Sequence, residues 1–280
     1  MLELGKYHVL KVLRETSVGL FLGDSQGNDV LLPRKYVTPE MKPGDMLSVF
    51  VYKDSEERSI ATTLKPKIEL NRFAYLPVAM TKDFGAFLSW GIENDLFVPL
   101  SEQPQRMKEG QSYLVYLYLD KKTNRLVASA KINKFLSNET VTVKVGEEVD
   151  LIIAEPTDLG FNVIINQLHR GLLYHNETFS PLKPGQHRKG YVKKIREDLN
   201  IDVQLDKIGY KKVASHSEII VNKLKKNKGF IPLTDSSSSE EIKTALEMSK
   251  KTFKKAIGLL YKQRIIAIES NGIRLQDEGE

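Results

Sequence analysis

Positive charge concentrated on one predicted strand is the strongest chemical signal in this sequence. The segment LKPGQHRKGYVKKIR, residues 182–196, holds six Lys or Arg residues and no acidic residue. A strand this basic suits a polyanion; the alternative is an exposed edge strand that its lysines protect from aggregation. Because side chains alternate along a strand, Tyr191 and Lys193 share one face, and Lys194 and Arg196 share the other. The candidate binding residues here are Arg188, Lys189, Tyr191, Lys193, Lys194 and Arg196.

The charge of the whole chain supports the same interpretation. The formal net charge is +6, but residues 183–264 hold 20 Lys or Arg against 9 Asp or Glu, whereas residues 1–182 hold 21 against 23. Positive charge gathered in one third of a chain indicates a surface for a polyanion rather than general solubility. A lysine-rich face that is simply solvated is the other interpretation.

The histidines and carboxylates do not have the spacing that catalysis needs. The 5 histidines show no metal-ligand spacing, and no acid pair recurs with them. Asp198 and Asp202 could hold a metal ion, but both lie in a predicted turn and strand start. The sequence lacks the glycine-rich phosphate loop, the nucleophile elbow and the dinucleotide fingerprint. We therefore predict a protein that is not an enzyme and that has no cofactor and no metal site.

The composition is that of an ordinary globular protein. The chain is 41% hydrophobic and 28% charged, with no apolar run long enough to span a membrane and no charged-then-apolar leader. Because cysteine is absent, disulfides, thiol nucleophiles and thiolate zinc sites are excluded. These features predict a cytoplasmic protein without a membrane partner.

An internal repeat predicts the elements that position the charged residues. Three similar turns occur at 41–45 (MKPGD), 107–111 (MKEGQ) and 182–186 (LKPGQ), and the glycine of each follows an earlier glycine by 25 residues. The period of 66 and then 75 residues fits a small domain with its own core, rather than a solenoid unit. The glycine pairs are Gly19 and Gly44, Gly85 and Gly110, and Gly160 and Gly185.

Each repeat has the pattern of five short strands. The second copy shows it best, since apolar segments of strand type alternate with turn residues over 72–130 and no helix signal of useful length intervenes. Five short strands that leave no exposed edge form a closed or nearly closed barrel. We therefore predict a mainly β protein with three tandem barrels, each with a small core.

One pair of segments identifies the barrel type. KDFGAFLSW (82–90) followed by DLFVPLSE (95–102) resembles the S1-type RNA-binding domain of the OB-fold class; the other two copies are more divergent. The resemblance implies barrels on which aromatic side chains stack on unpaired bases while basic residues follow the backbone. Such stacking is worth roughly 1–3 kcal/mol per base, whatever the sequence.

The resemblance also assigns stacking positions in the first two repeats. Phe84 and Phe87 match both aromatic positions of the motif in the second repeat. In the first repeat Val18 replaces the earlier aromatic, and only Phe21 is kept. For each aromatic, a place in the barrel core is the alternative.

The third repeat departs further from the motif. Leu159 and Asn162 stand at the two aromatic positions, and Phe161 is out of phase by one residue, which predicts that its side chain turns inward. Tyr174 stands where the family has a histidine, with His175 beside it. We predict that Tyr174 and His175 contact nucleic acid.

After residue 213 the pattern changes from strand to helix. Ser with Glu three positions later, at 215–218 and at 238–241, predicts two helix starts, and a third helix is predicted from near Ser249. A short strand, FIPL, follows the first helix, and Asn271-Gly272 is predicted to supply the positive φ values of a hairpin turn. The predicted apolar face of the third helix consists of Phe253, Ala256, Ile257, Leu260 and Tyr261.

This order of elements is that of a winged helix-turn-helix, whose last helix commonly enters a nucleic-acid groove. That helix is rich in lysine, which indicates a nucleic-acid contact; a winged helix that docks on protein, with solvated lysines, is the alternative. The candidate contact residues are Lys223, Lys226, Lys250, Lys251, Lys254 and Lys255.

Over all 280 residues, three S1-type barrels followed by a winged helix resemble the conserved virulence factor B family of bacterial regulators. The resemblance implies an RNA-binding regulatory protein of low-GC Gram-positive bacteria; it implies no individual RNA contact. The predicted domains are an S1-type OB-fold barrel over 1–66, a second with its linker over 67–145, a third, basic barrel over 146–213, and the winged-helix domain over 214–280.

The combined prediction is a protein that binds single-stranded RNA without catalysis. A basic surface formed by the third barrel and the winged helix holds the backbone, and bases stack on barrel aromatics. Two alternatives stay open at this point: a transcription regulator whose winged helix reads duplex DNA, and a scaffold that binds protein. The sequence leaves the oligomeric state open.

Overall fold

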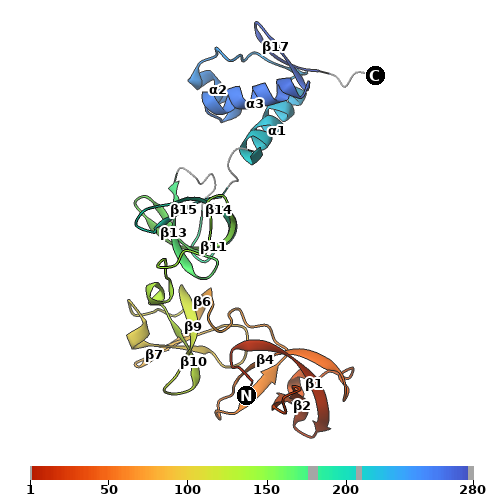
Figure 1. Ribbon diagram of the computed structural model, residues 1–280, viewed down its shortest axis with the longest axis vertical. Helices are drawn as coiled ribbons and strands as arrows, with labels where there is room; N and C mark the ends of the chain where they lie inside the picture. The colour runs from red at the N-terminus through yellow and green to blue at the C-terminus, as the bar shows by residue number, and fades with distance from the viewer. Residues whose placement is uncertain (1, 176–181, 206–209, 277–280) are drawn as a thin grey trace. The chain divides into compact units, whose positions relative to one another are not determined.

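The computed structural model describes residues 2–175, 182–205 and 210–276. Strands dominate as far as residue 204, and three α-helices follow (Figure 1). The chain is thus mainly β with a helical C-terminal part, as predicted from the sequence.

The first repeat forms a closed five-stranded barrel in the order β1-β2-β3-β5-β4. Neighbouring strands are antiparallel except β3 and β5, which pair in parallel with Leu31 opposite Ile60. That single parallel contact closes the barrel. Its strands are β1 (Lys6–Thr16), β2 (Gly19–Gly23), β3 (Asp29–Pro33), β4 (Met46–Lys53) and β5 (Ser59–Thr62), with a 3-10 helix, η1 (Arg34–Tyr36), after β3.

The second repeat is a five-stranded sheet in the order β10-β9-β6-β7-β8, so its two outer strands are not hydrogen-bonded to each other. A 3-10 helix, η2 (Leu100–Glu102), follows β8, and the amide of Ala130 donates to the carbonyl of Glu102 at 2.9 Å. The residue after β10 is therefore hydrogen-bonded to η2, which follows β8, at the point where pairing of β10 with β8 would close the barrel. The strands are β6 (Phe73–Lys82), β7 (Gly85–Leu88), β8 (Leu96–Pro99), β9 (Ser112–Asp120) and β10 (Arg125–Ser129), and η3 (Ile132–Phe135) follows.

The third repeat is again a closed barrel, in the order β11-β12-β13-β15-β14. This is the strand order of the first repeat, which the repeated turn and glycine spacing anticipated. The three turn glycines, Gly44, Gly110 and Gly185, all have the positive φ that the turn requires (103°, 74° and 80°). The strands are β11 (Glu148–Thr157), β12 (Gly160–Ile165), β13 (His169–Tyr174), β14 (His187–Ile195) and β15 (Ile201–Gln204).

The first two repeats do not have separate cores, although the sequence predicts one small core in each. Alternation along β4 buries Val49 and Val51 in the first barrel, while Phe50 and Tyr52 on the opposite face join the core of the second repeat. The ring of Phe50 meets that of Trp90 edge to face, 5.8 Å between centroids. A strand buried on both faces makes the two repeats one packed body.

A smaller apolar cluster joins the second and third repeats. Phe73 of β6 packs with Ile152 of β11 and Ile164 of β12. The Phe73 amide also donates to the side-chain oxygen of Gln167 at 2.6 Å. At Gly185 a Cβ would lie 2.4 Å from Tyr75, so this turn of the third repeat packs directly against β6.

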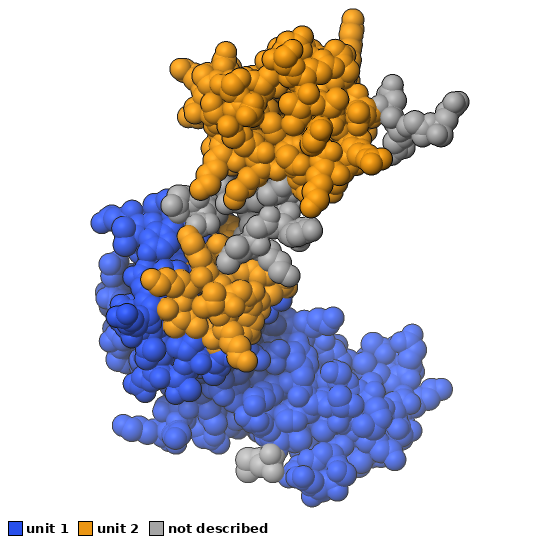
Figure 2. Space-filling model, turned by 45° about the horizontal axis from the view of Figure 1, so that its top comes forward, with its two compact units in different colours: residues 1–142, 149–189, 196–202 blue, residues 143–148, 190–195, 203–280 orange. Residues whose placement is uncertain are grey.

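By compactness the chain divides into two units, residues 1–142, 149–189 and 196–202, and residues 143–148, 190–195 and 203–280 (Figure 2). The division passes through β14, whose residues fall in both units. The bounds of the four predicted domains stay a prediction.

The C-terminal part is a winged helix. Its three helices surround an apolar core, and the three-stranded sheet has the order β16-β18-β17. As predicted, Ser238 and Ser249 are the N-caps of the second and third helices. The elements are α1 (Tyr210–Lys226), β16 (Phe230–Ile231), α2 (Ser239–Leu246), α3 (Lys250–Lys262), β17 (Ile266–Glu269) and β18 (Gly272–Leu275).

Three details of this part differ from the prediction. Helix α1 begins at Tyr210, so the Ser–Glu pair at 215–218 lies within it; residues three apart are neighbours on a helix, and this spacing therefore also occurs in helix interiors. Tyr261 is 58% exposed because a helical step of about 100° places it about 80° away from Phe253. The hairpin loop is Ser270-Asn271, and Gly272 already pairs with Glu269.

The cap of α2 allows a stability test. The Glu241 amide donates to the Ser238 hydroxyl at 3.2 Å, and the Ser238 amide donates to the Glu241 carboxylate at 2.7 Å, which lowers the pKa of Glu241. Replacing Ser238 by alanine should destabilise the winged helix by about 0.5–2 kcal/mol in thermal unfolding at neutral pH. The control is Ser270→Ala, in the exposed hairpin loop, and equal unfolding of the two variants would contradict the role of the cap.

The lowered pKa of Glu241 gives the cap a pH dependence. The carboxylate's share of the stability is present above the ordinary pKa of glutamate and is lost as the pH falls through the lowered folded-state value. The difference between Ser238→Ala and the parent protein should therefore shrink in acid.

Candidate nucleic-acid interface

An aromatic cluster lies on the surface of the second repeat. Phe84 is 58% exposed, and Phe87 and Phe97 are half-buried. Their ring centroids are 6.0 Å apart for Phe84 and Phe87, 5.9 Å for Phe84 and Phe97, and 5.2 Å for Phe87 and Phe97. The two residues assigned from the motif thus lie together, and a third ring joins them.

Strand alternation and register build this cluster. In β7 and β8 the buried residues alternate with Phe87 and Phe97, which therefore point outward, and these two are direct partners in the sheet. A Cβ on Gly85 would lie 2.5 Å from the Phe97 ring, so glycine lets that ring lie across β7. The motif did not reveal Phe97; the signal that could have found it is alternation combined with the pairing of these two strands.

A small cavity beside Gly85 has two cations in its lining. Lys82 and Arg106 line this cavity of about 160 Å³ together with Asp83. Both side chains are exposed, and neither has a carboxylate partner within the part of the chain that the structure describes. Exposed rings beside unpaired cations can stack on bases and bind the adjoining phosphates.

The first repeat lacks such a cluster. Phe21 is half-buried and faces outward, but the guanidinium of Arg14 covers its ring at 4.0 Å from the centroid, and Arg14 is bonded to Asp29 at 3.4 Å. At the earlier motif position Val18 is 56% exposed. The predicted stacking role of Phe21 therefore requires Arg14 to move aside.

The corresponding face of the third repeat has charged side chains where that of the second has aromatic rings. Leu159, which is 62% exposed, lines a cavity of about 390 Å³ with Asp158, Asn162, Arg170 and Arg196. Phe161 is half-buried and meets His175 edge to face at 5.5 Å, so the predicted inward turn does not seal it in the core. Arg170 had no sequence signal, since it lies outside the basic segment.

Arg196 is held by its neighbours. Its guanidinium forms an ion pair with Asp202 at 2.6 Å and donates to the hydroxyl of Tyr174. The hydrogen bond to Asp202 raises the pKa of Arg196. Asp202 is thus the partner of an arginine, and Arg196 offers a nucleic acid less charge than the sequence suggests.

The basic strand β14 has a mixed environment. Gly190 and Val192 are buried, so Tyr191 and Lys193 point to the opposite face, as predicted. Tyr191 is half-buried and its hydroxyl donates to Glu148 at 2.6 Å, and Lys189 pairs with Asp150 at 2.7 Å. The exposed cations of the strand are Arg188, Lys189, Lys193 and Lys194.

The outward face of α3 carries lysines. Lys251 and Lys255 are exposed and one turn apart. Lys254 is 3.7 Å from Asp235, and Lys250 donates to the carbonyl of Ser236 at 3.3 Å. Lys251 and Lys255 are therefore the better candidates. On α1, Lys223 is half-buried and Lys226 is exposed.

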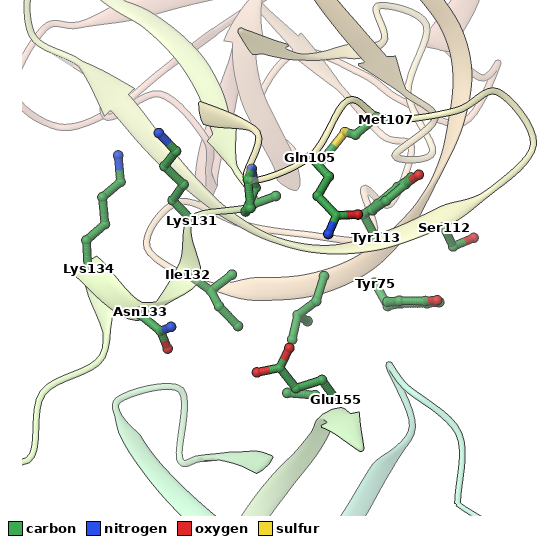
Figure 3. A pocket seen from close by; sticks show the side chains of 14 residues that line it. Tyr75, Gln105, Met107, Ser112, Tyr113, Lys131, Ile132, Asn133, Lys134 and Glu155 are labelled. Carbon is green, nitrogen blue, oxygen red and sulfur yellow. The ribbon is translucent and has the colours of Figure 1, made fainter. Parts of the chain in front are cut away.

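Figure 3 shows a larger pocket, of about 710 Å³, at the junction of the second and third repeats. The rings of Tyr75 and Tyr113 and the side chain of Met107 form one side, and the ammonium groups of Lys131 and Lys134 extend along another. Most of its wall is apolar, and Glu155 adds a negative charge. Glu155 and the ion pair between Lys134 and Glu102 offset the two lysine charges, so this lining does not favour an anion.

A metal site was not predicted, and within the described residues no three His, Asp or Glu side chains are grouped as metal ligands would be. The buried His169 has both ring nitrogens bonded, to the carbonyl of Ser137 and to the hydroxyl of Thr142, each at 2.7 Å. In the same described residues no helix has the length and apolar character that crossing a bilayer requires.

Two family models match this chain. The S1 domain matches residues 4–64 and 72–131, and the CvfB-like winged helix domain matches residues 218–275. Both are binding domains rather than catalytic ones. The third repeat lies outside these ranges, so its assignment to the S1 type stays a prediction.

Curated relatives cover nearly the whole chain. Conserved virulence factor B of Staphylococcus haemolyticus is 24% identical and covers 98% of this chain and 95% of its own length. The uncharacterized protein YitL of Bacillus subtilis is 25% identical over 92% of this chain and 89% of its own length. A crystal structure of a multidomain protein with nucleic acid binding domains from Streptococcus pneumoniae is similar with a TM-score of 0.40, 23% identity and 98% coverage of both chains.

Proposed function

Because this chain belongs to the conserved virulence factor B family, with its S1 domains and CvfB-like winged helix domain, we propose that it binds single-stranded RNA in a regulatory role and without catalysis. The observation that carries the proposal is the exposed cluster of Phe84, Phe87 and Phe97. Contiguous exposed apolar surface marks a binding site, and here Phe84 is 58% exposed while the half-buried Phe87 and Phe97 extend the surface.

The rings favour unpaired bases over a duplex. A base stacks only when its face is accessible, which is the case in single strands and not inside a helix. In this proposal Lys82 and Arg106, which line a cavity beside Gly85, bind the phosphates of the stacked strand. We therefore assign the second repeat the largest share of base contacts.

The third repeat and the winged helix supply the cationic contacts in this proposal. The third repeat shares the strand order of the first, which supports an S1-type barrel, and presents Arg170, Arg188 and Lys194 at its surface. The winged helix presents Lys251 and Lys255 on α3. Each can bind phosphates of the same RNA, and the binding constant should fall steeply with salt because counterions are released.

The lysine face of α3 also fits duplex DNA, which makes a DNA-binding regulator the second candidate. A gel shift that compares an unstructured RNA of about 20 nucleotides with a duplex DNA of equal length, at one salt concentration, separates the two. Tighter binding of the RNA supports the proposal. Tighter binding of the duplex favours the second candidate, and a failure to bind either favours a protein-binding scaffold.

Charge reversal on α3 tests the share of the winged helix. The double variant Lys251→Glu, Lys255→Glu should weaken RNA binding by about 3- to 30-fold and reduce the slope of log K against log salt by about 0.7 for each phosphate that is no longer neutralised. Fluorescence anisotropy at several salt concentrations measures both quantities. The matched control is the double variant Lys121→Glu, Lys122→Glu in the exposed turn between β9 and β10, which changes the net charge by the same amount. An equal loss of affinity in the control would mean that only net charge matters.

A further inference from the structure

A second, smaller pocket at the junction of the second and third repeats has a different lining from the apolar one. Its volume is about 580 Å³, and all of its lining residues belong to the larger compact unit. Arg72, directly before β6, contributes from one repeat, and Arg188 of β14 contributes from the next. Two arginines far apart in the sequence therefore line one cavity.

Neither of these two arginines forms an ion pair within the described part of the chain. Both side chains are exposed. The pocket has one carboxylate, that of Asp150, and Lys189 is 2.7 Å from it. The net charge of the lining is therefore positive.

The amide side chains at this pocket also present donors. The turn between β12 and β13 contributes Asn166 and Gln167 to the lining. The oxygen of Asn166 accepts from the Asp150 amide at 2.9 Å, and that of Gln167 accepts from the Phe73 amide at 2.6 Å. With both oxygens used, the NH₂ groups are the ends left to bind a ligand, and they can only donate.

We propose that this pocket binds a phosphate group through Arg72 and Arg188, and that the group belongs to the RNA backbone; this rests on the function proposed above. Arginine suits the role because its planar fork donates two hydrogen bonds to phosphate oxygens. Hydrogen-bond donors that are already fixed before binding lose less conformational entropy when the ligand binds. Here Phe73, Gln167 and Gly185 hold the two repeats together around the pocket.

The position of the pocket sets the length of RNA that can use it. Arg72 and Lys82 flank opposite ends of β6, a strand of 10 residues, which is about 30 Å long. At about 3.4 Å per nucleotide in a stacked strand, an RNA needs about nine nucleotides to occupy both the aromatic cluster and the pocket. An oligonucleotide of about 20 nucleotides is long enough for the test.

The test compares the double variant Arg72→Ala, Arg188→Ala with the parent protein in the full chain. For an unstructured RNA of about 20 nucleotides, anisotropy should show affinity lowered about 3- to 30-fold and a salt slope reduced by about 0.7, the value for one phosphate. The variant Arg72→Lys, Arg188→Lys keeps the charge without the fork and should be intermediate. Lys122→Ala, which removes an exposed cation elsewhere on the second repeat, should bind as the parent does.

Inorganic phosphate, titrated against the amide NMR signals of Asn166 and Gln167, separates the two sources of phosphate. Signals that shift in the parent and not in the double variant, together with weaker RNA binding, support the proposal. The NMR shifts could instead disappear in the double variant while its RNA affinity stays unchanged. That result would show that the pocket binds an anion, but it would overturn RNA as the ligand.

Unchanged RNA affinity and salt slope, with no phosphate response, would overturn the pocket proposal altogether. The function itself would survive that result if Phe84→Ala still weakens RNA binding. It would fail instead if the parent protein bound no RNA.

Discussion

Replacing Phe84 by alanine should weaken the binding of single-stranded RNA by about 5- to 150-fold and leave the thermal stability almost unchanged. One stacked base is worth roughly 1–3 kcal/mol, which corresponds to that range of affinity. The ring is 58% exposed and lies 6.0 Å from the ring of Phe87 and 5.9 Å from that of Phe97, so its removal opens no cavity in the core. Anisotropy with a labelled RNA measures the affinity, and circular dichroism on heating measures the stability.

The matched control for this substitution is Val18→Ala. Val18 occupies the same motif position in the first repeat and is 56% exposed, but no aromatic cluster surrounds it. We expect its RNA affinity to equal that of the parent protein. If Phe84→Ala bound RNA as tightly as Val18→Ala does, the aromatic cluster would not be the base-binding surface.

Replacing Phe50 by alanine should lower the free energy of unfolding by about 3–5 kcal/mol. Phe50 is fully buried, and deleting a buried aromatic side chain loses its transfer free energy and leaves a cavity. Because its ring packs in the core of the second repeat, the two repeats should lose stability together. Trp90 is the single tryptophan of the chain, and its ring centroid is 5.8 Å from that of Phe50. Its fluorescence during denaturant unfolding therefore reports on this core.

A phenylalanine on the outward face of β2, in the same barrel, provides the control. Phe21 is half-buried under Arg14, and Phe21→Ala should cost about 1 kcal/mol or less. A small loss of stability for Phe50→Ala, or separate unfolding transitions for the first and second repeats, would show that the shared core does not couple them. Coupling also means that binding is better mapped with point variants than by cutting the chain between repeats.

The repeat and the order of modules could be predicted because they depend on local patterns. Strands need alternating apolar residues and turns need glycine, so the repeated turn predicted five strands in each repeat, and Gly44, Gly110 and Gly185 have the positive φ that such turns require. Phe84 and Phe87 could be assigned for the same reason, because a motif with a fixed strand phase also determines which side chains face outward. The N-caps at Ser238 and Ser249 are likewise local.

Prediction from local patterns was wrong where the same residue spacing is compatible with two different structures. The Ser–Glu pair at 215–218 fits a cap and a helix interior equally well, and Tyr261 lies at the edge of an apolar face where a small angle decides burial. Asn271-Gly272 suggested a turn, but Gly272 is the first residue of β18. A Cβ there would lie 2.4 Å from the Ile231 carbonyl oxygen, so this position needs glycine for a close approach and not for a turn. That close approach comes from a strand about 40 residues earlier.

Four features could be predicted from the sequence alone: the strand pattern, the repeat, the order of the modules and the basic C-terminal third. Each of them depends on residues that lie close together in the chain. Tertiary structure alone brought Phe97 against Phe87, joined Phe50 to Trp90, and neutralised Arg196 with Asp202. The physical reason is that stacking, burial and ion pairing act over a few ångströms in space. Whether an aromatic ring is exposed, or a cation unpaired, therefore depends on neighbours that only the packing of the repeats provides.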